Sequence, residues 1–470
     1  MIPNTEDIGP SRKIAEFVSH TSLKDIPAAA IEGAKLTILD TIGVGLAALD
    51  QPVAKAIQEY VRSMGGEPAA TVMGMGGYRT SPALAALANG CFFNMLDFDG
   101  FGHVPTCVLP AALAVGETIR ASGERVLEAS ILAAEAQTQL DHAIAGRSSS
   151  FGGLTYRGWY HVSVCGPIGA ALAAGKLLGL DARQTQEAMG TAACASGGVR
   201  KNMGTRAKSL FSGNSASFGV TAALLAKAGV SGDPDVLEGQ GGLVNTLCSP
   251  GEFDWAPIME HLGKSYELAG SLGMKRYPAV SGVGQIIAAL EQLRRTSGFD
   301  GSEVVRVEAR LTPKPAKSTP IPGLVDDWSI SPTVSGLSDY PPDELAAEFS
   351  MSYGIAVTLL DGTFNVDHLT EGRVQDPRTR ELASKIEFIP LKTWSDHPES
   401  VTVYLRDGRS FTAETRQPRR TLQREDFVAK FKDCAGRHLA GAQVEQLCEH
   451  ILEMEKLDTI GEVAATLARR

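Results

Sequence analysis

Residues 166–175 read Gly-Pro-Ile-Gly-Ala-Ala-Leu-Ala-Ala-Gly, an apolar run made almost entirely of small residues. Small side chains let neighbouring helices approach closely, so the run predicts the interior of a tightly packed helical bundle. The apolar stretch begins at Val164 and is stopped by Lys176, which makes it too short and too glycine-rich to cross a bilayer. We therefore predict a core helix over 164–178 and no membrane association.

The helical pattern extends on both sides of this run, from Lys13 to about Gly229. Asp181 is a plausible N-cap for the helix that follows it towards Met189. One apolar stripe recurs at spacings of three and four, as in a core-facing helix: Ile31, Ala34, Ile38, Ile42 and Leu46. Strand signals are nearly absent from this half, and further helices are predicted over 83–95, 110–121, 126–145 and 212–228.

Strand signals begin after Gly273. Apolar and polar residues largely alternate in the first of them, which is typical of a half-buried strand, and Asp407-Gly408 is a hairpin signal. Strands are predicted over 304–311, 384–388 and 400–405.

The remaining segments complete a two-domain division. Residues 312–342 are rich in proline and glycine and predict a long surface connection. A helix is predicted over 349–360, and the pattern is helical again from Arg424 to the end. We predict a mainly α fold, in which a large all-helical domain (1–269 and 406–470, discontinuous) carries a smaller α/β lid domain (270–405).

The composition of the 470 residues argues against several classes of protein. Lys and Arg total 44 against 54 Asp and Glu, a net charge of −10, and no basic run is long enough to suggest nucleic-acid binding. The seven cysteines are scattered without a C-x-x-C pair, which fits reduced thiols in a cytoplasmic protein. We find no Walker loop, nucleophile elbow, H-E-x-x-H or dinucleotide fingerprint, so the sequence disfavours nucleotide-dependent and zinc-dependent enzymes.

The first segment that carries chemistry joins two predicted helices between Asn94 and Pro110. It is a glycine-rich turn that contains Asp97, Asp99 and His103. The aspartates alone are equally well explained by helix capping and solvation. The functional alternative is an acid/base group on a rigid loop, and His103 is the better candidate because histidine titrates near neutral pH.

Three further segments carry cations close to predicted helices. Arg206 and Lys208 precede an apolar helix, Lys275 comes just before Tyr277 near the inferred domain junction, and Arg79 precedes another helix. Each cation alone is more often a surface charge than a ligand. Together they suit an anionic substrate, since cations and helix N-termini both favour carboxylates.

An aromatic segment precedes the core helix over 164–178. Tyr156, Tyr160 and His161 lie within it. These side chains are candidates for the wall of a pocket, and an ordinary packed helix entry is an equally good explanation.

Taken together, these segments resemble the MmgE/PrpD family, whose members include 2-methylcitrate dehydratases, cis-aconitate decarboxylases and an iminodisuccinate epimerase. Leu96-Asp-Phe-Asp99 and Gly204-Thr-Arg-Ala-Lys208 are two of the matching stretches. The matches run in the family's order across nearly the whole chain, at 38–43, 85–90, 96–99, 109–114, 204–208, 275–278 and 348–353.

The resemblance implies a helical domain closed by an α/β lid, with the active site in the cleft between them. It also implies a homodimer and no metal or organic cofactor. Asp97 and His103 match the family's aspartate and histidine, and Lys208 and Lys275 match its pocket lysines.

The chain departs from the family where imidazoles are usual. Tyr160 stands where the family commonly has a histidine, with His161 one residue later. Gly284 and Phe211 occupy two further positions at which the family usually has histidine. The proton-transfer groups are therefore altered, although the cations are retained.

The resulting hypothesis is a cofactor-independent lyase acting on a small di- or tricarboxylate, of the 2-methylcitrate dehydratase or cis-aconitate decarboxylase type. Lys208 and Lys275, with Arg79 as a further candidate, would stabilise charge that develops on carbon. Asp97 and His103 would move the proton, and the candidates to replace a missing histidine as acid are Tyr156, Tyr160 and His161. An isomerase or epimerase of a dicarboxylate such as iminodisuccinate is the alternative, and a non-catalytic carboxylate-binding protein is the alternative of another class. Substrate contacts are expected from Arg79, Tyr156, Arg206 and Tyr277.

Overall fold

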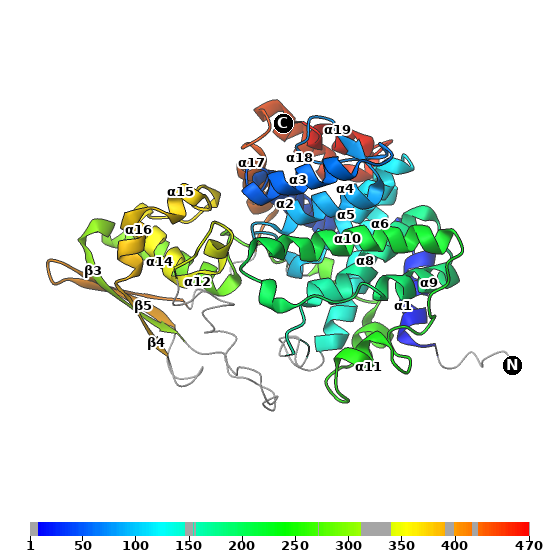
Figure 1. Cartoon of the computed structure of the whole chain (residues 1–470), viewed down its shortest axis with the longest axis horizontal. Helices are drawn as coiled ribbons and strands as arrows, with labels where there is room; N and C mark the ends of the chain where they lie inside the picture. Colours follow the sequence, from blue (N-terminus) through cyan, green and yellow to red (C-terminus); the bar gives the residue numbers. More distant parts are fainter. Residues whose placement is uncertain are drawn as a thin grey trace.

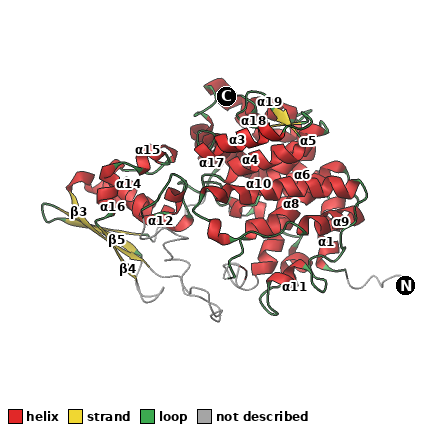
Figure 2. Cartoon of the chain, viewed as in Figure 1, coloured by secondary structure: helices red, strands yellow, loops and turns green. Residues whose placement is uncertain are grey.

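The computed structural model describes residues 8–145, 154, 157–270, 272–311, 340–390, 399–415 and 422–469. Within these residues the chain is mainly helical and has one two-stranded and one four-stranded sheet. Figure 1 shows a large helical unit beside a smaller unit that holds the larger sheet, and Figure 2 shows how few strands there are. The predicted fold class, mainly α with a smaller α/β part, is confirmed.

The small-residue run lies at the centre of the helical unit. It forms most of α8 (His161–Leu178), and 83% of this helix is buried, so its apolar length serves the protein core. α8 packs against α5 (Pro105–Thr118), α6 (Gly123–Ala145), α9 (Ala182–Ala193) and α10 (Leu210–Lys227). At the contact with α10, a Cβ added to Gly219 would lie 2.4 Å from the Cβ of Ala170. Small residues are therefore required here, as the sequence predicted.

The predicted helices of this unit are present with small shifts of their ends. α2 (Ala28–Ala47), α4 (Pro82–Asn94) and α6 follow the predicted ranges, and Asp181 caps α9 by accepting a hydrogen bond from the backbone N–H of Gln184 at 2.8 Å. The predicted start of α5 at residue 110 was wrong. The helix begins at Pro105 and contains Pro110, because Pro105 already supplies the N-terminal proline that a helix start favours.

The smaller unit is a four-stranded sheet with helices on one side of it (Figure 1). The strands are β3 (Val304–Leu311), β4 (Ile386–Pro390), β5 (Ser400–Leu405) and β6 (Ser410–Glu414), in the spatial order β4-β3-β5-β6. β3 runs parallel to β4 and antiparallel to β5. The helices are α12 (Ser281–Ser297), α14 (Met351–Asp361), α15 (Glu371–Val374) and α16 (Pro377–Ala383).

The sheet extends beyond position 405, where the sequence placed the end of the lid. β6 pairs antiparallel with β5 through the turn at Asp407 and Gly408, and Gly408 has a φ of 88°. The hairpin signal was therefore correct, whereas the predicted lid boundary after residue 405 falls inside the hairpin. Most of the predicted long connection, 312–342, lies outside the described residues.

The C-terminal helices return to the helical unit. α17 (Arg424–Ala435) and α18 (Gly441–Leu452) pack against α2, and α19 (Gly461–Leu467) contacts α5. α1 (Pro10–His20) and α3 (Pro52–Met64) belong to the same unit, so both ends of the described chain lie there (Figure 1).

Candidate active site

The loop that follows α4 has an unusual backbone. Asp97, Phe101 and His103 have positive φ angles of 45°, 47° and 67°, and Gly102 lies between the last two at 63°. Left-handed backbone at a non-glycine residue costs about 1–3 kcal/mol and persists only where surrounding contacts enforce it. The loop is therefore strained, and it carries the acidic and imidazole groups that the sequence singled out.

Contacts from distant parts of the chain hold this loop in place. The N–H of Gly100 donates to Asp40 Oδ2 at 3.0 Å, and the N–H of Phe101 donates to the carbonyl of Gly273 at 3.1 Å. Lys430 of α17 lies 2.7 Å from Asp40 Oδ1 and donates to the carbonyl of Phe98 at 2.7 Å. The C-terminal helices thus help to position the loop.

Asp97 lies between two lysines that come from different parts of the sequence. Its Oδ1 is 2.6 Å from Lys208 Nζ, and its Oδ2 is 2.5 Å from Lys275 Nζ. Lys208 also donates to the carbonyl of Asn94, and Lys275 to the carbonyl of Asp97, each at 2.8 Å. An ammonium group has three N–H bonds, so among the described contacts each lysine keeps one N–H available.

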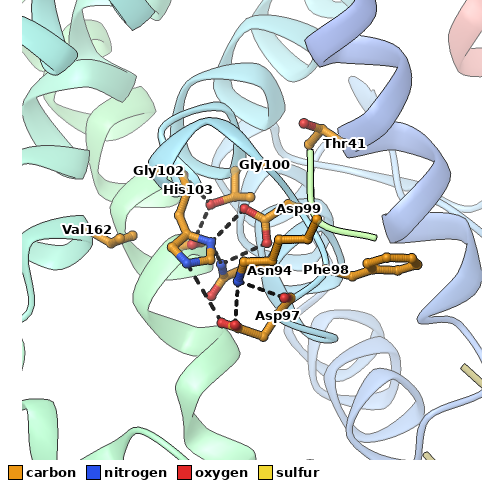
Figure 3. A network of polar contacts seen from close by, with 12 residues as sticks. Thr41, Asn94, Asp97, Phe98, Asp99, Gly100, Gly102, His103 and Val162 are labelled. Carbon is orange, nitrogen blue, oxygen red and sulfur yellow. Dashed lines mark hydrogen bonds and ion pairs between the residues drawn. The ribbon is translucent and has the colours of Figure 1, made fainter. Parts of the chain in front are cut away.

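His103 is oriented by Asp99. Its Nδ1 lies 2.7 Å from Asp99 Oδ2, which assigns a proton to Nδ1, while Asn94 Nδ2 donates to Asp99 Oδ1 at 3.4 Å. The other ring nitrogen, Nε2, faces Asp97 Oδ1 at 3.7 Å. Figure 3 shows Asn94, Asp97, Asp99 and His103 pointing toward one another. Nε2 is therefore the nitrogen that can accept or carry a proton beside the lysines.

These five residues (Asp97, Asp99, His103, Lys208 and Lys275) form what we call the central cluster. The side chain of His103 is 15% exposed, whereas those of Asp97 and Lys208 are 3% exposed. Burial would raise the pKa of Asp97, but Lys208 and Lys275 hold that pKa well below its usual range. Burial would likewise lower the pKa of Lys208, but Asp97 raises it. The buried Asp97–Lys208 pair therefore stays ionised.

Tyr160 and His161 lie beside the cluster, at the start of α8. The Tyr160 hydroxyl is buried and has no hydrogen-bond partner among the described residues, and burial, with the charges of Asp97 and Asp99, raises its pKa well above the ordinary value. Burial and the neighbouring His103 lower the pKa of His161 to about 3, and its Nε2 lies 3.4 Å from the carbonyl of Gly102. Neutral His161 and protonated Tyr160 are hydrogen-bonding groups at neutral pH.

The predicted substrate-binding residues have other partners. Arg79 lies on β2 (Arg79–Thr80), where it pairs with Glu117 at 3.2 Å and donates to the carbonyl of Ala69 at 2.8 Å. Arg206 makes two hydrogen bonds to Glu344, at 3.1 and 2.9 Å.

The Tyr277 hydroxyl donates to Glu291 of α12 at 2.6 Å. None of these three side chains has a polar contact with the central cluster among the described residues, and Tyr156 lies outside the described residues. A Cβ added to Gly284 would lie 3.7 Å from the Tyr277 ring, so this position has room for a side chain.

Sequence reasoning missed two buried acids at this site. Asp40 holds the loop by accepting the hydrogen bond from the N–H of Gly100. Glu348 belongs to the smaller unit, in the short helix Ala346–Phe349, and is fully buried; the charges of Lys208 and Asp97 act on it. Both residues lie in stretches that match the family pattern, which was the available signal.

The described residues contain no group of three His, Cys, Asp or Glu side chains arranged to hold a metal ion. A cavity of about 500 Å³ opens elsewhere on the helical unit and shares no residue with the central cluster. Its lining is of mixed charge and includes Asp50, Lys55, Glu59, Arg62 and His438.

Gly100→Ala should disturb the site through the backbone. A Cβ at Gly100 would lie 1.8 Å from the carbonyl oxygen of Gly273, so the segment that carries Lys275 must move. We expect a loss of about 1–3 kcal/mol in the free energy of unfolding, measured in urea. Gly282→Ala is the control, because nothing lies within 4 Å of a Cβ there. Equal stability of Gly100→Ala and wild type would contradict the close contact.

Comparison with known proteins gives the family. The MmgE/PrpD N-terminal domain matches residues 12–256, and the MmgE/PrpD C-terminal domain matches residues 277–454. The chain is 27% identical to cis-aconitate decarboxylase of Homo sapiens over 453 residues, which cover 91% of this chain and 88% of the relative. It is 24% identical to cis-aconitate decarboxylase of Aspergillus terreus over 96% of this chain and 94% of the relative.

A third relative is the mitochondrial 2-methylcitrate dehydratase of Yarrowia lipolytica, 24% identical over 97% of this chain and 88% of the relative. The named relatives are decarboxylases and dehydratases, which are lyases. Both family domains occur in the family's order and together span most of the described residues. The chain therefore belongs to the MmgE/PrpD family.

Proposed function

We propose that the protein is a cofactor-independent lyase acting on a small polycarboxylate, of the cis-aconitate decarboxylase or 2-methylcitrate dehydratase type. The observation that carries the proposal is a pair of lysines beside an imidazole, Lys208 buried and Lys275 partly exposed, each with one N–H available among the described contacts. A substrate carboxylate can take up the two free N–H groups without displacing Asp97. The names of the relatives support a substrate of this class.

The two reaction types share an intermediate that fits this arrangement. Decarboxylation breaks a C–C bond, releases CO2 and moves the electron pair through the double bond onto a carbon next to another carboxylate, which then takes a proton. Dehydration removes a proton from such a carbon and expels hydroxide, which leaves as water once protonated. In both, negative charge spreads into a carboxylate, where fixed ammonium groups stabilise it as it develops.

Different observations favour the two reactions. Decarboxylation is favoured by full-length similarity to cis-aconitate decarboxylases from three organisms. Dehydration is favoured by His103, because a proton on Nδ1 leaves Nε2 with a lone pair that can act as a base. In either reaction His103, with 15% of its side chain exposed, can exchange protons with solvent.

The test is an NMR experiment in D2O with cis-aconitate, 2-methylcitrate and iminodisuccinate. Loss of CO2 from cis-aconitate, or formation of an alkene from 2-methylcitrate, supports the proposal. Solvent deuterium entering iminodisuccinate without loss of material identifies an epimerase, and shifted ligand lines without chemistry identify a binding protein. Either of the last two outcomes contradicts the lyase. Lys208→Met, which removes one of the two ammonium groups, should lower activity in each assay. Lys432→Met, which removes an exposed lysine of α17, is its control.

Four further properties of the protein can be tested beside its activity. We propose that the α/β unit acts as a lid, that the protein works in the cytoplasm as a homodimer, and that it needs no metal. Activity that survives chelation by EDTA, and a dimeric mass by light scattering, would support these expectations.

A further inference from the structure

Glu348 is a buried acid near the site whose carboxyl group has no ion pair or hydrogen bond within the described residues. It is 0% exposed, and neither of its carboxyl oxygens has a hydrogen-bond partner among the residues that the structure describes. A buried polar group without a partner costs about 1–3 kcal/mol, so native proteins satisfy nearly all of them. An unsatisfied carboxyl group is therefore unusual and points to a function.

The surroundings place Glu348 at the central cluster, on the side of the smaller unit. Its carbonyl accepts a hydrogen bond from the N–H of Val280, at the start of α12, at 3.0 Å. The ring of the next residue, Phe349, lies 5.6 Å from Lys208 Nζ. The charges of Lys208, Asp97, Lys275 and Asp99 all act on the Glu348 carboxyl. The backbone is thus anchored to one unit while the side chain lies near the buried ions of the other.

The lysines nearby do not supply Glu348 with a counter-ion. Each ammonium group is paired with one carboxylate oxygen of Asp97, and neither donates a hydrogen bond to Glu348. Burial, together with the negative charges of Asp97 and Asp99, outweighs the lysines and raises the pKa of Glu348 well above its ordinary value. Glu348 therefore holds a proton at neutral pH, in contrast to ionised Asp97.

We propose that Glu348 is the acid of the lyase reaction and gives its proton to the substrate; this inference rests on the proposed function. In decarboxylation, the C–CO2 bond breaks, CO2 leaves, and the carbon that receives the electron pair takes the Glu348 proton. In dehydration, the proton goes to the departing hydroxyl group and water leaves. In both, Glu348 becomes a carboxylate and regains a proton from solvent before the next turnover. This proton source compensates for the imidazoles missing at Tyr160 and Gly284.

Glu348→Gln is the informative substitution, because glutamine keeps the shape and can donate a hydrogen bond but cannot release a proton. We expect kcat to fall by about 10²–10⁴ on whichever substrate the wild type converts, with KM changed by only a few-fold. If Glu348 merely donated a hydrogen bond to a substrate carboxylate, Glu348→Gln would keep its kcat. A kcat within about threefold of wild type overturns the proposal.

Glu135→Gln is the matched control. Glu135 is another fully buried glutamate with a raised pKa, but it lies in α6, where it bonds with Gln139 and the backbone of Glu267. Its substitution should leave kcat unchanged. A similar loss of kcat in both variants would mean that burying any glutamine slows the enzyme, and would overturn the specific role of Glu348.

Infrared spectroscopy tests the proton on Glu348 without any turnover. Mildly alkaline solution ionises Glu135 and Asp141, whose pKa values are raised to about 7. Under these conditions the wild type should retain a protonated-carboxyl C=O band that Glu348→Gln lacks and that shifts when cis-aconitate is added. Absence of that band, or a band that cis-aconitate does not shift, overturns the proposal even if no substrate is converted. Failure of the proposed function appears differently, as a wild type that converts none of the three substrates.

Discussion

His103→Gln is expected to lower kcat by about 10²–10⁴ while cis-aconitate still binds with nearly wild-type affinity. His103 Nε2 lies beside the Asp97–lysine pairs, and its ring is fixed by the 2.7 Å contact to Asp99. Glutamine can replace a hydrogen bond of the ring but not its proton transfer. The measurements are steady-state kinetics for kcat and calorimetry for the dissociation constant.

The control for this variant is His142→Gln. His142 lies on α6 with 47% of its side chain exposed, and its ion-pair contact within the described residues is a 3.9 Å approach to Glu267, so its loss should not change kcat. If His103→Gln and wild type turn over equally, His103 has no part in proton transfer. The role would then pass to Glu348 or to the segment that contains Tyr160 and His161.

Asp97→Asn should produce the largest loss of stability of any change in the cluster. It leaves Lys208, of which 3% is exposed, as a buried ammonium group without its counter-ion. Breaking a buried ion pair from one side costs about 3–5 kcal/mol, and we expect a loss of that size in the free energy of unfolding in urea. Asp407→Asn, which alters an exposed pair with Arg409, should change that free energy by less than about 1 kcal/mol.

The pH dependence of this loss provides a second check. The pKa of Asp97 is lower in the folded protein than the ordinary value of 3.8, because the lysines outweigh burial. The stabilisation is therefore fully present above that value and is lost as the pH falls through the lower, folded pKa. The difference between Asp97→Asn and wild type should be largest at neutral pH and should shrink in acid. A difference that does not depend on pH would show that the charge of Asp97 is not what stabilises the fold.

Periodicity predicted the helices because their apolar stripes and caps are local. Asp181 identified the start of α9, and the small residues of α8 identified the core, since both signals depend only on neighbouring residues. Sequence patterns do not fix the end of a helix where two local signals compete. Pro105 and Pro110 are both acceptable first residues of a helix, and only the packed structure shows which one begins α5.

The residues of the candidate site likewise differ in how far the sequence could identify them. Family-matched stretches pointed to Asp97, His103, Lys208 and Lys275, and the structure brings these four together. Arg79 and Tyr277 have partners far along the chain, Glu117 and Glu291, which no local pattern could reveal.

Glu348 was missed for a related reason. A glutamate just before an apolar helix usually caps the helix and faces solvent. The burial of Glu348 arises only when the smaller unit packs beside Lys208. Its importance therefore depends on tertiary structure, although its position in a family-matched stretch was visible.

We propose that Lys208 and Lys275 hold a substrate carboxylate beside His103 and Glu348. The most direct measurement is a crystal structure of the His103→Gln variant with cis-aconitate, which this variant should bind without converting it. We predict a ligand carboxylate within hydrogen-bonding distance of both Nζ atoms, with the Asp97 contacts retained and the carbon skeleton facing Glu348. A ligand ordered elsewhere, with both lysines bound only to Asp97 and the backbone carbonyls, would show that these lysines do not bind the substrate.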